Sequence, residues 1–233
     1  MSWPGRYHRI DELDPIPYQH EWPSLRCITG RVDIHSLVAF FVKECRFHGH
    51  YLEFGVGSGR SAVASIRAHA RENGSGIEKF FLFDSFEGLP KLAGPDEDSV
   101  QFHEGQFAFS QEDVRAKLEK HGVWDPERVV MVPGFFDQSL PAFDRERFGG
   151  LGASVVHIDV DLYGSVRGAL DFVTPMLHQG SVILFDDWNC FDASWQKGER
   201  AATREWLEAN PHLNLESYER YGFHGEVFLV HGA

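Results

Sequence analysis

The sequence predicts an α/β fold in which one mostly parallel sheet carries helices on both of its faces. Three observations support this prediction. Short apolar runs alternate with segments whose apolar residues recur at helical spacing. A glycine-rich turn follows the first of these runs, and pairs of aspartates follow two later ones. The chain closes with two further apolar runs on either side of a turn, which predicts a terminal hairpin.

Size and composition restrict the class of protein. A chain of 233 residues, 42% of them hydrophobic, can form one large domain or two small ones with a substantial core. No apolar stretch approaches the roughly 20 residues of a membrane-spanning helix, so neither a membrane partner nor a secretory leader is expected. The net charge of −13 argues against nucleic acid as a partner, because its phosphates are bound by basic surfaces. The three cysteines lack CxxC spacing, and we therefore expect a reduced, cytoplasmic protein.

The chain begins with a segment that is unlike the rest. Residues 1–30 are rich in proline and aromatic residues and show no periodicity, so they are assigned to an N-terminal arm. Residues 31–233 are assigned to a single domain. Its first element is a helix over residues 31–47, where apolar residues recur at the i, i+3, i+4, i+7 spacing of an amphipathic helix.

Strands and helices then alternate along the domain. Apolar runs predict strands over residues 51–54, 80–83, 128–132, 153–158 and 181–185. Apolar stripes at helical spacing predict helices over residues 61–71, 111–120, 163–177 and 197–209. The last helix ends before Pro211, which cannot continue it. The hairpin strands are residues 213–218 and 226–230.

The long connection formed by residues 85–110 shows no periodicity. Connections of this length are often lids over a binding site, and a mixture of acidic residues with Phe102, Phe107 and Phe109 suits a cap over an acceptor. A loop that is merely solvated explains the same residues equally well. Both interpretations stay open at this point.

Two aspartate clusters stand at the ends of two predicted strands. His157-Ile158-Asp159-Val160-Asp161 closes one strand, and Phe185-Asp186-Asp187-Trp188 closes the next. A helix connects these strands, so they are expected to be parallel neighbours with both clusters at one edge of the sheet. Three or four carboxylates there would repel one another, and a hard cation such as Mg²⁺ would relieve the repulsion. The alternative is that the aspartates cap the following helices, which explains one aspartate per strand but not two.

The glycine-rich turn is Gly55-Val56-Gly57-Ser58-Gly59, with Glu53 before it and Asp84 at the end of the next strand. Glycines let the backbone turn sharply and approach a ligand, and the following helix presents unpaired N–H groups to it. A nicotinamide site would show GxGxxG, whereas this turn is GxGxG. The combination with Glu53 and with Asp84, which could hold a ribose, fits S-adenosylmethionine better than NAD. A tight turn without any ligand is the alternative.

Several longer stretches make the chain similar to a known family. They are Phe83-Asp84-Ser85-Phe86-Glu87-Gly88-Leu89-Pro90, Gly134-Phe135-Phe136-Asp137-Gln138-Ser139-Leu140-Pro141, His157-Ile158-Asp159-Val160-Asp161-Leu162-Tyr163, Asp186-Asp187 and Lys197-Gly198-Glu199-Arg200-Ala201-Ala202. From about residue 33 to 230 the chain resembles the class I methyltransferases, and among them the macrocin O-methyltransferase (TylF-type) family. The resemblance implies a Rossmann-like, seven-stranded, mostly parallel sheet with an antiparallel last strand. It also implies S-adenosylmethionine as the donor and a Mg²⁺-assisted transfer to a hydroxyl, which in better-known members belongs to a sugar of an antibiotic.

The resemblance implies roles for particular residues. The cofactor is expected to contact Glu53, Gly55, Gly57, Ser61, Asp84, Ser85, Phe86 and Asp159, with the ribose at Asp84. The metal is expected at Asp159, Asp186 and Asp187, and Asp159 is the expected base. Asp161 is left without an assigned role. The related catechol methyltransferases carry a lysine three residues after the first metal-binding aspartate, where this chain has Leu162, so a lysine base is excluded there.

The resulting prediction is a Mg²⁺-dependent O-methyltransferase. Its acceptor is expected to be a small hydroxylated molecule, a glycoside of a natural product or a glycan, and a homodimer is expected. A phenolic acceptor is one alternative, and a non-catalytic protein that only binds S-adenosylmethionine or a nucleotide is another. A nicotinamide dehydrogenase is disfavoured because the chain lacks both the GxGxxG turn and a suitable catalytic set.

Overall fold

The computed structural model describes residues 33–72 and 75–233, so the predicted arm over residues 1–30 lies outside the described residues. The strands are β1 (Gly49–Phe54), β2 (Ile77–Asp84), β3 (Val129–Pro133), β4 (Ala153–Ile158), β5 (Val182–Phe185), β6 (Asn214–Tyr221) and β7 (Gly225–His231). The α-helices are α4 (Ile34–Glu44), α5 (Arg60–Arg71), α6 (Gln111–Lys120), α7 (Phe136–Ala142), α8 (Tyr163–Val173) and α9 (Gly198–Ala209). Short 3-10 helices occur at η1 (Gly94–Asp96), η2 (Arg145–Phe148), η3 (Thr174–Met176) and η4 (Phe191–Ala193).

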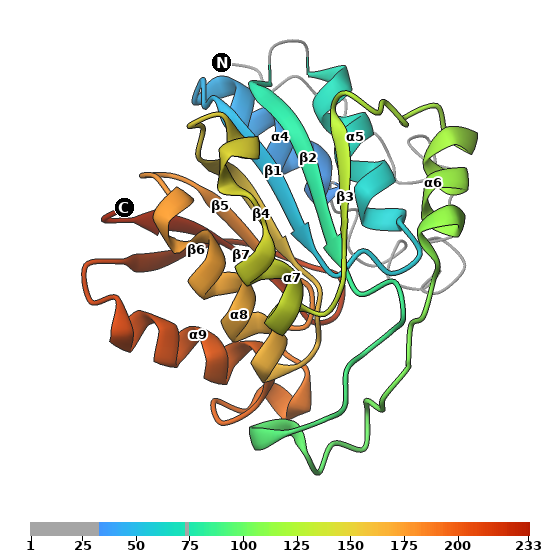
Figure 1. Cartoon of the computed structure of the whole chain (residues 1–233). Helices are drawn as coiled ribbons and strands as arrows, with labels where there is room; N and C mark the ends of the chain where they lie inside the picture. The colour runs from blue at the N-terminus through green and yellow to red at the C-terminus, as the bar shows by residue number, and fades with distance from the viewer. Residues whose placement is uncertain (1–32, 73–74) are drawn as a thin grey trace.

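The strands form one seven-stranded sheet in the order β3-β2-β1-β4-β5-β7-β6 (Figure 1). Neighbours from β3 to β5 are parallel, whereas β7 pairs antiparallel with both β5 and β6. The predicted mostly parallel sheet with an antiparallel last strand is therefore confirmed. The order also places β1 near the centre of the sheet, between β2 and β4.

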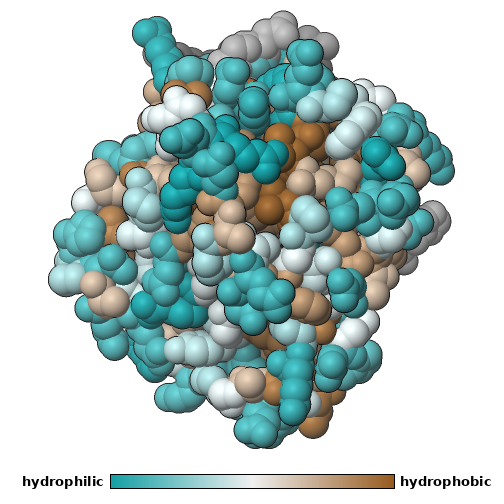
Figure 2. All heavy atoms as spheres, in the orientation of Figure 1, coloured by the Kyte–Doolittle hydropathy of each residue, from teal (hydrophilic) through white to brown (hydrophobic). Residues whose placement is uncertain are grey.

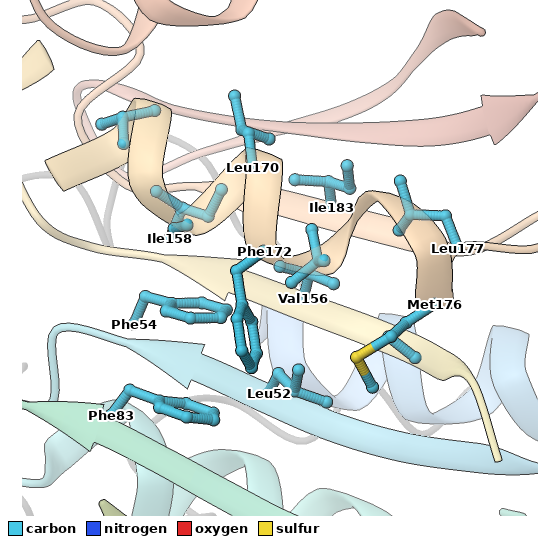
Figure 3. Packing of buried hydrophobic residues seen from close by; sticks show 14 of the residues in the cluster. Leu52, Phe54, Phe83, Val156, Ile158, Leu170, Phe172, Met176, Leu177 and Ile183 are labelled. Carbon is cyan, nitrogen blue, oxygen red and sulfur yellow. The ribbon is translucent and has the colours of Figure 1, made fainter. Parts of the chain in front are cut away.

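Helices cover both faces of this sheet and bury a separate apolar cluster on each (Figure 1). One cluster lies under α4, α5 and α6, and the other lies under α7, α8 and α9. The central strand β1 serves both, because successive side chains of a strand point to opposite faces. Tyr51 joins the α5 side, and Leu52 and Phe54 join the α8 side. Figure 3 shows Phe54 and Phe83, whose rings stack at 4.8 Å, facing Phe172 of α8.

Two features of the helices differ from the prediction. The segment from 163 to 177 is not one continuous helix: α8 ends at Val173, and a 3-10 turn follows over Thr174–Met176. Pro175 explains the change, because its nitrogen carries no hydrogen to continue the α-helical bonding. The second difference is α7, which was not predicted from the sequence. It has only seven residues, with Pro141 in its last turn, and is too short to show a periodic apolar stripe.

The outer surface of the face seen in Figure 1 is mostly hydrophilic, with hydrophobic residues visible in a few places (Figure 2). Within residues 33–72 and 75–233, no helix combines the length and the apolar character that crossing a membrane would require.

Candidate active site

The carboxyl ends of β1 and β4 mark the point where the sheet changes its winding direction. The chain leaves β1 into α5 on one face and leaves the neighbouring strand β4 into α8 on the other (Figure 1). In open α/β sheets, ligands bind in the crevice beyond the strand ends at such a reversal. The glycine-rich turn follows β1, and Asp84 is the last residue of β2. The two aspartate clusters follow β4 and β5, so the structure brings all of these residues to this edge of the sheet.

Backbone contacts connect the strand ends at this edge. The backbone N–H of Asp159 donates to the carbonyl of Phe54 at 2.9 Å, and that of Asp186 donates to the carbonyl of Ile158 at 3.0 Å. Gly55 lies directly against Asp159: a Cβ atom added to Gly55 would stand 1.8 Å from the Asp159 carbonyl oxygen. Its φ of +81° is also unfavourable for any other residue. Only glycine therefore allows the glycine-rich turn to contact the first aspartate cluster.

Glu53, in the last part of β1, stabilises the start of the glycine-rich turn. Its side chain is 0% exposed. Oε1 accepts a hydrogen bond from the hydroxyl of Ser61 at 2.6 Å, and Oε2 accepts one from the hydroxyl of Tyr51 at 2.7 Å. Burial raises the pKa of Glu53 to about 7, although these two hydrogen bonds lower it in part. Glu53 and Ser61 thus bind each other in this structure and hold β1 and α5 on the two sides of the turn.

Asp84 holds the turn from the side of β2. Its Oδ2 accepts hydrogen bonds from the backbone N–H groups of Val56 and Gly57 at 2.6 and 3.0 Å. Its Oδ1 accepts one from the N–H of Phe86 at 2.6 Å. The hydroxyl of Ser85 donates to the carbonyl of Gly88 at 2.7 Å and so closes the next turn. A carboxylate can accept about four hydrogen bonds, and the only further contact of the Asp84 carboxylate among the described residues is a long one of 3.5 Å from the hydroxyl of Ser85, so one position is left for a ligand hydroxyl.

The aspartates after β4 and β5 form one electrostatic cluster. Asp159, Asp186 and Asp187 are partly exposed, whereas Asp161 is buried. Burial, followed by the charge of Asp187, raises the pKa of Asp186 to about 7. Burial and the charges of Asp186 and Asp187 raise the pKa of Asp159 well above its ordinary range. These carboxyl groups therefore lie close enough to oppose one another's ionisation, as the strand order predicted.

Asp161 belongs to the same cluster. Burial raises its pKa well above the ordinary range, and the charge of Asp187 and a side-chain hydrogen bond with Asp187 raise it further. Its backbone has a φ of +59°, and the N–H of Leu162 donates to the carbonyl of Val160 across it at 2.5 Å. Such a tight turn is strained for a residue other than glycine and persists only where its surroundings hold it. The segments that follow β2 and β5 also contain non-glycine residues with positive φ, namely Phe86, Phe191, Asp192 and Ala193.

Glu199 is a fifth acidic residue of the cluster, although no role there is predicted for it from the sequence. It lies in the first turn of α9 and is 1% exposed. Neither of its carboxyl oxygens has a hydrogen-bond partner among the described residues. Burial raises its pKa well above the ordinary range, and the charges of Asp187 and Asp186 raise it further. An acidic residue is common in the first turn of a helix, so the sequence alone offered no reason to place it here.

The chemistry of these side chains fits a hard divalent cation. Five carboxyl groups supply only oxygen donors, and the two oxygens of Glu199 are buried without a partner among the described residues. Within the described ranges, however, no three His, Cys, Asp or Glu side chains already converge as a ready set of metal ligands. The structure therefore shows the donors in one place but not a closed coordination sphere.

Comparison with known proteins places this geometry in a family. The sequence model described as macrocin O-methyltransferase (TylF) matches residues 19–210. A relative from Streptomyces olivaceus is 31% identical over 191 residues, which cover 78% of this chain and 70% of the relative. Its name is 8-demethyl-8-(2,3-dimethoxy-alpha-L-rhamnosyl)-tetracenomycin-C 4'-O-methyltransferase.

Solved structures show the same fold at lower sequence identity. The O-methyltransferase NovP matches with a TM-score of 0.71 and 20% identity, covering 84% of this chain and 77% of that one. An O-methyltransferase from Bacillus cereus, solved in complex with S-adenosylhomocysteine, matches with a TM-score of 0.58 and 16% identity. That match covers 95% of this chain and 94% of the other.

Proposed function

The chain belongs to the macrocin O-methyltransferase (TylF) family and is an O-methyltransferase, and from this premise we propose that it methylates a sugar hydroxyl of a natural-product glycoside with S-adenosylmethionine as donor. One observation carries the proposal. The glycine-rich turn and the carboxylate cluster are in direct contact through Gly55 and Asp159. A donor bound at the turn would thus present its methyl group to an acceptor held at the carboxylates. The name of the Streptomyces relative, which acts on a rhamnosyl group, supports a sugar as the acceptor.

The proposed donor site lies around the glycine-rich turn. Gly55 and Gly57 would lie along the methionine part of the donor, with Glu53 and Ser61 fixing the turn beneath it. Asp84 would accept a hydrogen bond from a ribose hydroxyl with its remaining lone pair. Ser85 and Phe86 would lie at the adenine, and Asp159 at the sulfonium end. The Bacillus cereus structure with bound S-adenosylhomocysteine, which shares the fold, supports this choice of cofactor.

The proposed acceptor site lies at the carboxylate cluster. Asp159, Asp186 and Asp187 would hold Mg²⁺, whose chemistry is to lower the pKa of a nearby hydroxyl and to orient it. Asp159 would accept the proton from the acceptor hydroxyl, because it is the member of the cluster that contacts the glycine-rich turn. Asp161, which the same cluster holds in a strained turn, is a second candidate for this proton. Alignment of donor and acceptor can contribute about 7–11 kcal/mol to lowering the barrier.

A panel of acceptors tests the proposed function. The purified chain is incubated with S-adenosylmethionine, Mg²⁺ and either a rhamnosylated aromatic polyketide, the sugar-free polyketide or catechol. Mass spectrometry is expected to show a gain of one methyl on the rhamnosylated compound alone. If only catechol were methylated, the acceptor would be a phenol and the proposed sugar acceptor would be wrong. Gel filtration of the same preparation tests the predicted homodimer.

The metal is tested by chelation and by substitution. EDTA is expected to abolish turnover, and Asp187→Ala is expected to lower it more than about a hundredfold while S-adenosylhomocysteine still binds. Asp171→Ala is the matched control, because Asp171 lies on the exposed side of α8 in an ion pair with Arg167. Full activity in EDTA would contradict the proposed metal requirement but not the proposed donor site.

A further inference from the structure

Asp96 is a buried acidic residue in the long connection formed by residues 85–110. It lies in the short helix η1 and is only 1% exposed, whereas its neighbour Glu97 is exposed. Its Oδ2 accepts a hydrogen bond from the backbone N–H of Tyr163 at 2.5 Å, and its Oδ1 accepts one from that of Gly198 at 3.0 Å. These partners are 67 and 102 residues away in sequence. A single carboxylate thus joins three distant segments.

Both partners are the first residues of helices that lack a cap of their own. Tyr163 begins α8 and Gly198 begins α9, and the residues before them, Leu162 and Lys197, make no side-chain capping hydrogen bond. The first N–H groups of a helix have no partner within it, and the helix dipole favours a negative charge there. Asp96 therefore caps two helices at once from a separate segment.

Further contacts hold the same connection against the segment that follows Asp187. The N–H of Phe191 donates to the side chain of Gln101 at 3.1 Å, whereas the ion pair between Lys197 and Asp98 is exposed and adds little. The rings of Phe102 and Phe191 lie 5.4 Å apart. The connection is therefore docked against the segments that begin α8 and α9, and Figure 1 shows it in green beyond the strand ends.

The two capped positions carry members of the carboxylate cluster next to them. Tyr163 follows Asp161 by two residues, and Gly198 directly precedes Glu199. The two segments also contact each other, because a Cβ atom added to Gly198 would stand 3.4 Å from the carbonyl oxygen of Asp161. Asp96 therefore binds the backbone close to both Asp161 and Glu199.

We propose that Asp96 is a positioning residue for methyl transfer, which couples docking of residues 96–102 to the arrangement of Asp161 and Glu199 within the carboxylate cluster. The inference rests on the proposed acceptor site. It does not involve the glycine-rich turn, which is held by Glu53 and Asp84 on the other side of the crevice. Loss of Asp96 should therefore impair the acceptor step and spare the donor.

The experiment compares Asp96→Asn with Asp98→Asn in the full chain. Asparagine offers only one acceptor oxygen, so one of the two helix N–H groups loses its partner. Asp98 is a matched control, because its side chain is 79% exposed and its ion pair with Lys197 contributes little. Hydrogen exchange measures the protection of the amides of Tyr163 and Gly198. Calorimetry measures the affinity for S-adenosylhomocysteine, and steady-state kinetics measure methylation of the rhamnosylated acceptor.

For Asp96→Asn we expect faster exchange at Tyr163 or Gly198 and a kcat about ten- to a hundredfold lower, with an unchanged KM for the donor and unchanged S-adenosylhomocysteine binding. Asp98→Asn should match the natural chain in all three measurements. If Asp96→Asn had the same amide exchange and the same kcat as the natural chain, the inference would be overturned. It would also be overturned if the variant lost donor binding as strongly as it lost kcat. If the natural chain methylates no acceptor, the proposed function fails, but the exchange measurement still decides whether Asp96 docks the connection.

Discussion

The hydroxyl of Ser61 donates a 2.6 Å hydrogen bond to Oε1 of Glu53, and both side chains are buried. The contact joins the central strand β1 to the start of α5, and the glycine-rich turn lies between the two residues in sequence. A buried carboxyl group therefore maintains the geometry of the turn. Its protonation has consequences for stability that can be measured.

The first prediction concerns pH. The pKa of Glu53 is raised from 4.5 to about 7 by burial, so its contribution to stability is fully present below pH 4.5 and is lost as the pH rises through about 7. Between pH 4.5 and 8, the free energy of unfolding should fall by about 3 kcal/mol more in the natural chain than in Glu53→Gln, at 1.36 kcal/mol per pKa unit. Urea unfolding at several pH values measures this difference. If the free energy of unfolding changed with pH in the same way in both proteins, Glu53 would not titrate in this range.

The second prediction separates two glycines of the turn. Gly55→Ala should destabilise the protein by about 3 kcal/mol or more, because its Cβ would collide with the Asp159 carbonyl. Gly57→Ala meets no atom within 4 Å, so only its positive φ costs stability, about 1–2 kcal/mol. It should nevertheless weaken S-adenosylhomocysteine binding. Gly122→Ala is the control, because Gly122 has a positive φ and open space but lies after α6, and it should leave binding unchanged.

The third prediction concerns Glu199. Its pKa is raised by burial and by the neighbouring aspartates, so its contribution to stability is present at low pH and is lost as the pH rises through the raised value. Glu199→Gln should therefore stabilise the protein at pH 8, by roughly 1–3 kcal/mol, and less at pH 5. Thermal unfolding at both pH values measures the effect. Glu208→Gln is the control at an exposed position of the same helix, and it should leave the stability unchanged at both pH values. If Glu199→Gln were less stable than the natural chain at pH 8, the placement of Glu199 in the cluster would be contradicted.

The fourth prediction concerns cysteine reactivity. Cys190 is buried and donates its thiol to Asp187 at 3.1 Å, and burial raises its pKa far above the ordinary range. Cys45 is exposed. Because only the thiolate reacts, iodoacetamide at pH 8 should modify Cys45 much faster than Cys190 in the folded protein. Peptide mapping after short labelling measures both sites, and equal rates would show that the segment after Asp187 is open.

The order of strands and helices was predictable because each element carries a local pattern. The apolar stripe of Val166, Leu170, Val173 and Leu177 indicated a helix, and all four residues are buried. The helix ends earlier than predicted, at Val173, because Pro175 interrupts the α-helical hydrogen bonding. The short helix α7 left no periodic signal, since seven residues make only two turns.

The sequence by itself determined the two acidic clusters, the GxGxG turn and their arrival at one edge of the sheet, because strand, helix, strand connectivity makes neighbouring strands parallel. Only the tertiary structure placed Glu199 in the cluster and made Asp96 a cap for two helices. Both depend on contacts between residues far apart in sequence, where no periodic pattern records which segments meet. Local patterns follow from backbone geometry, whereas these contacts arise when the whole chain packs.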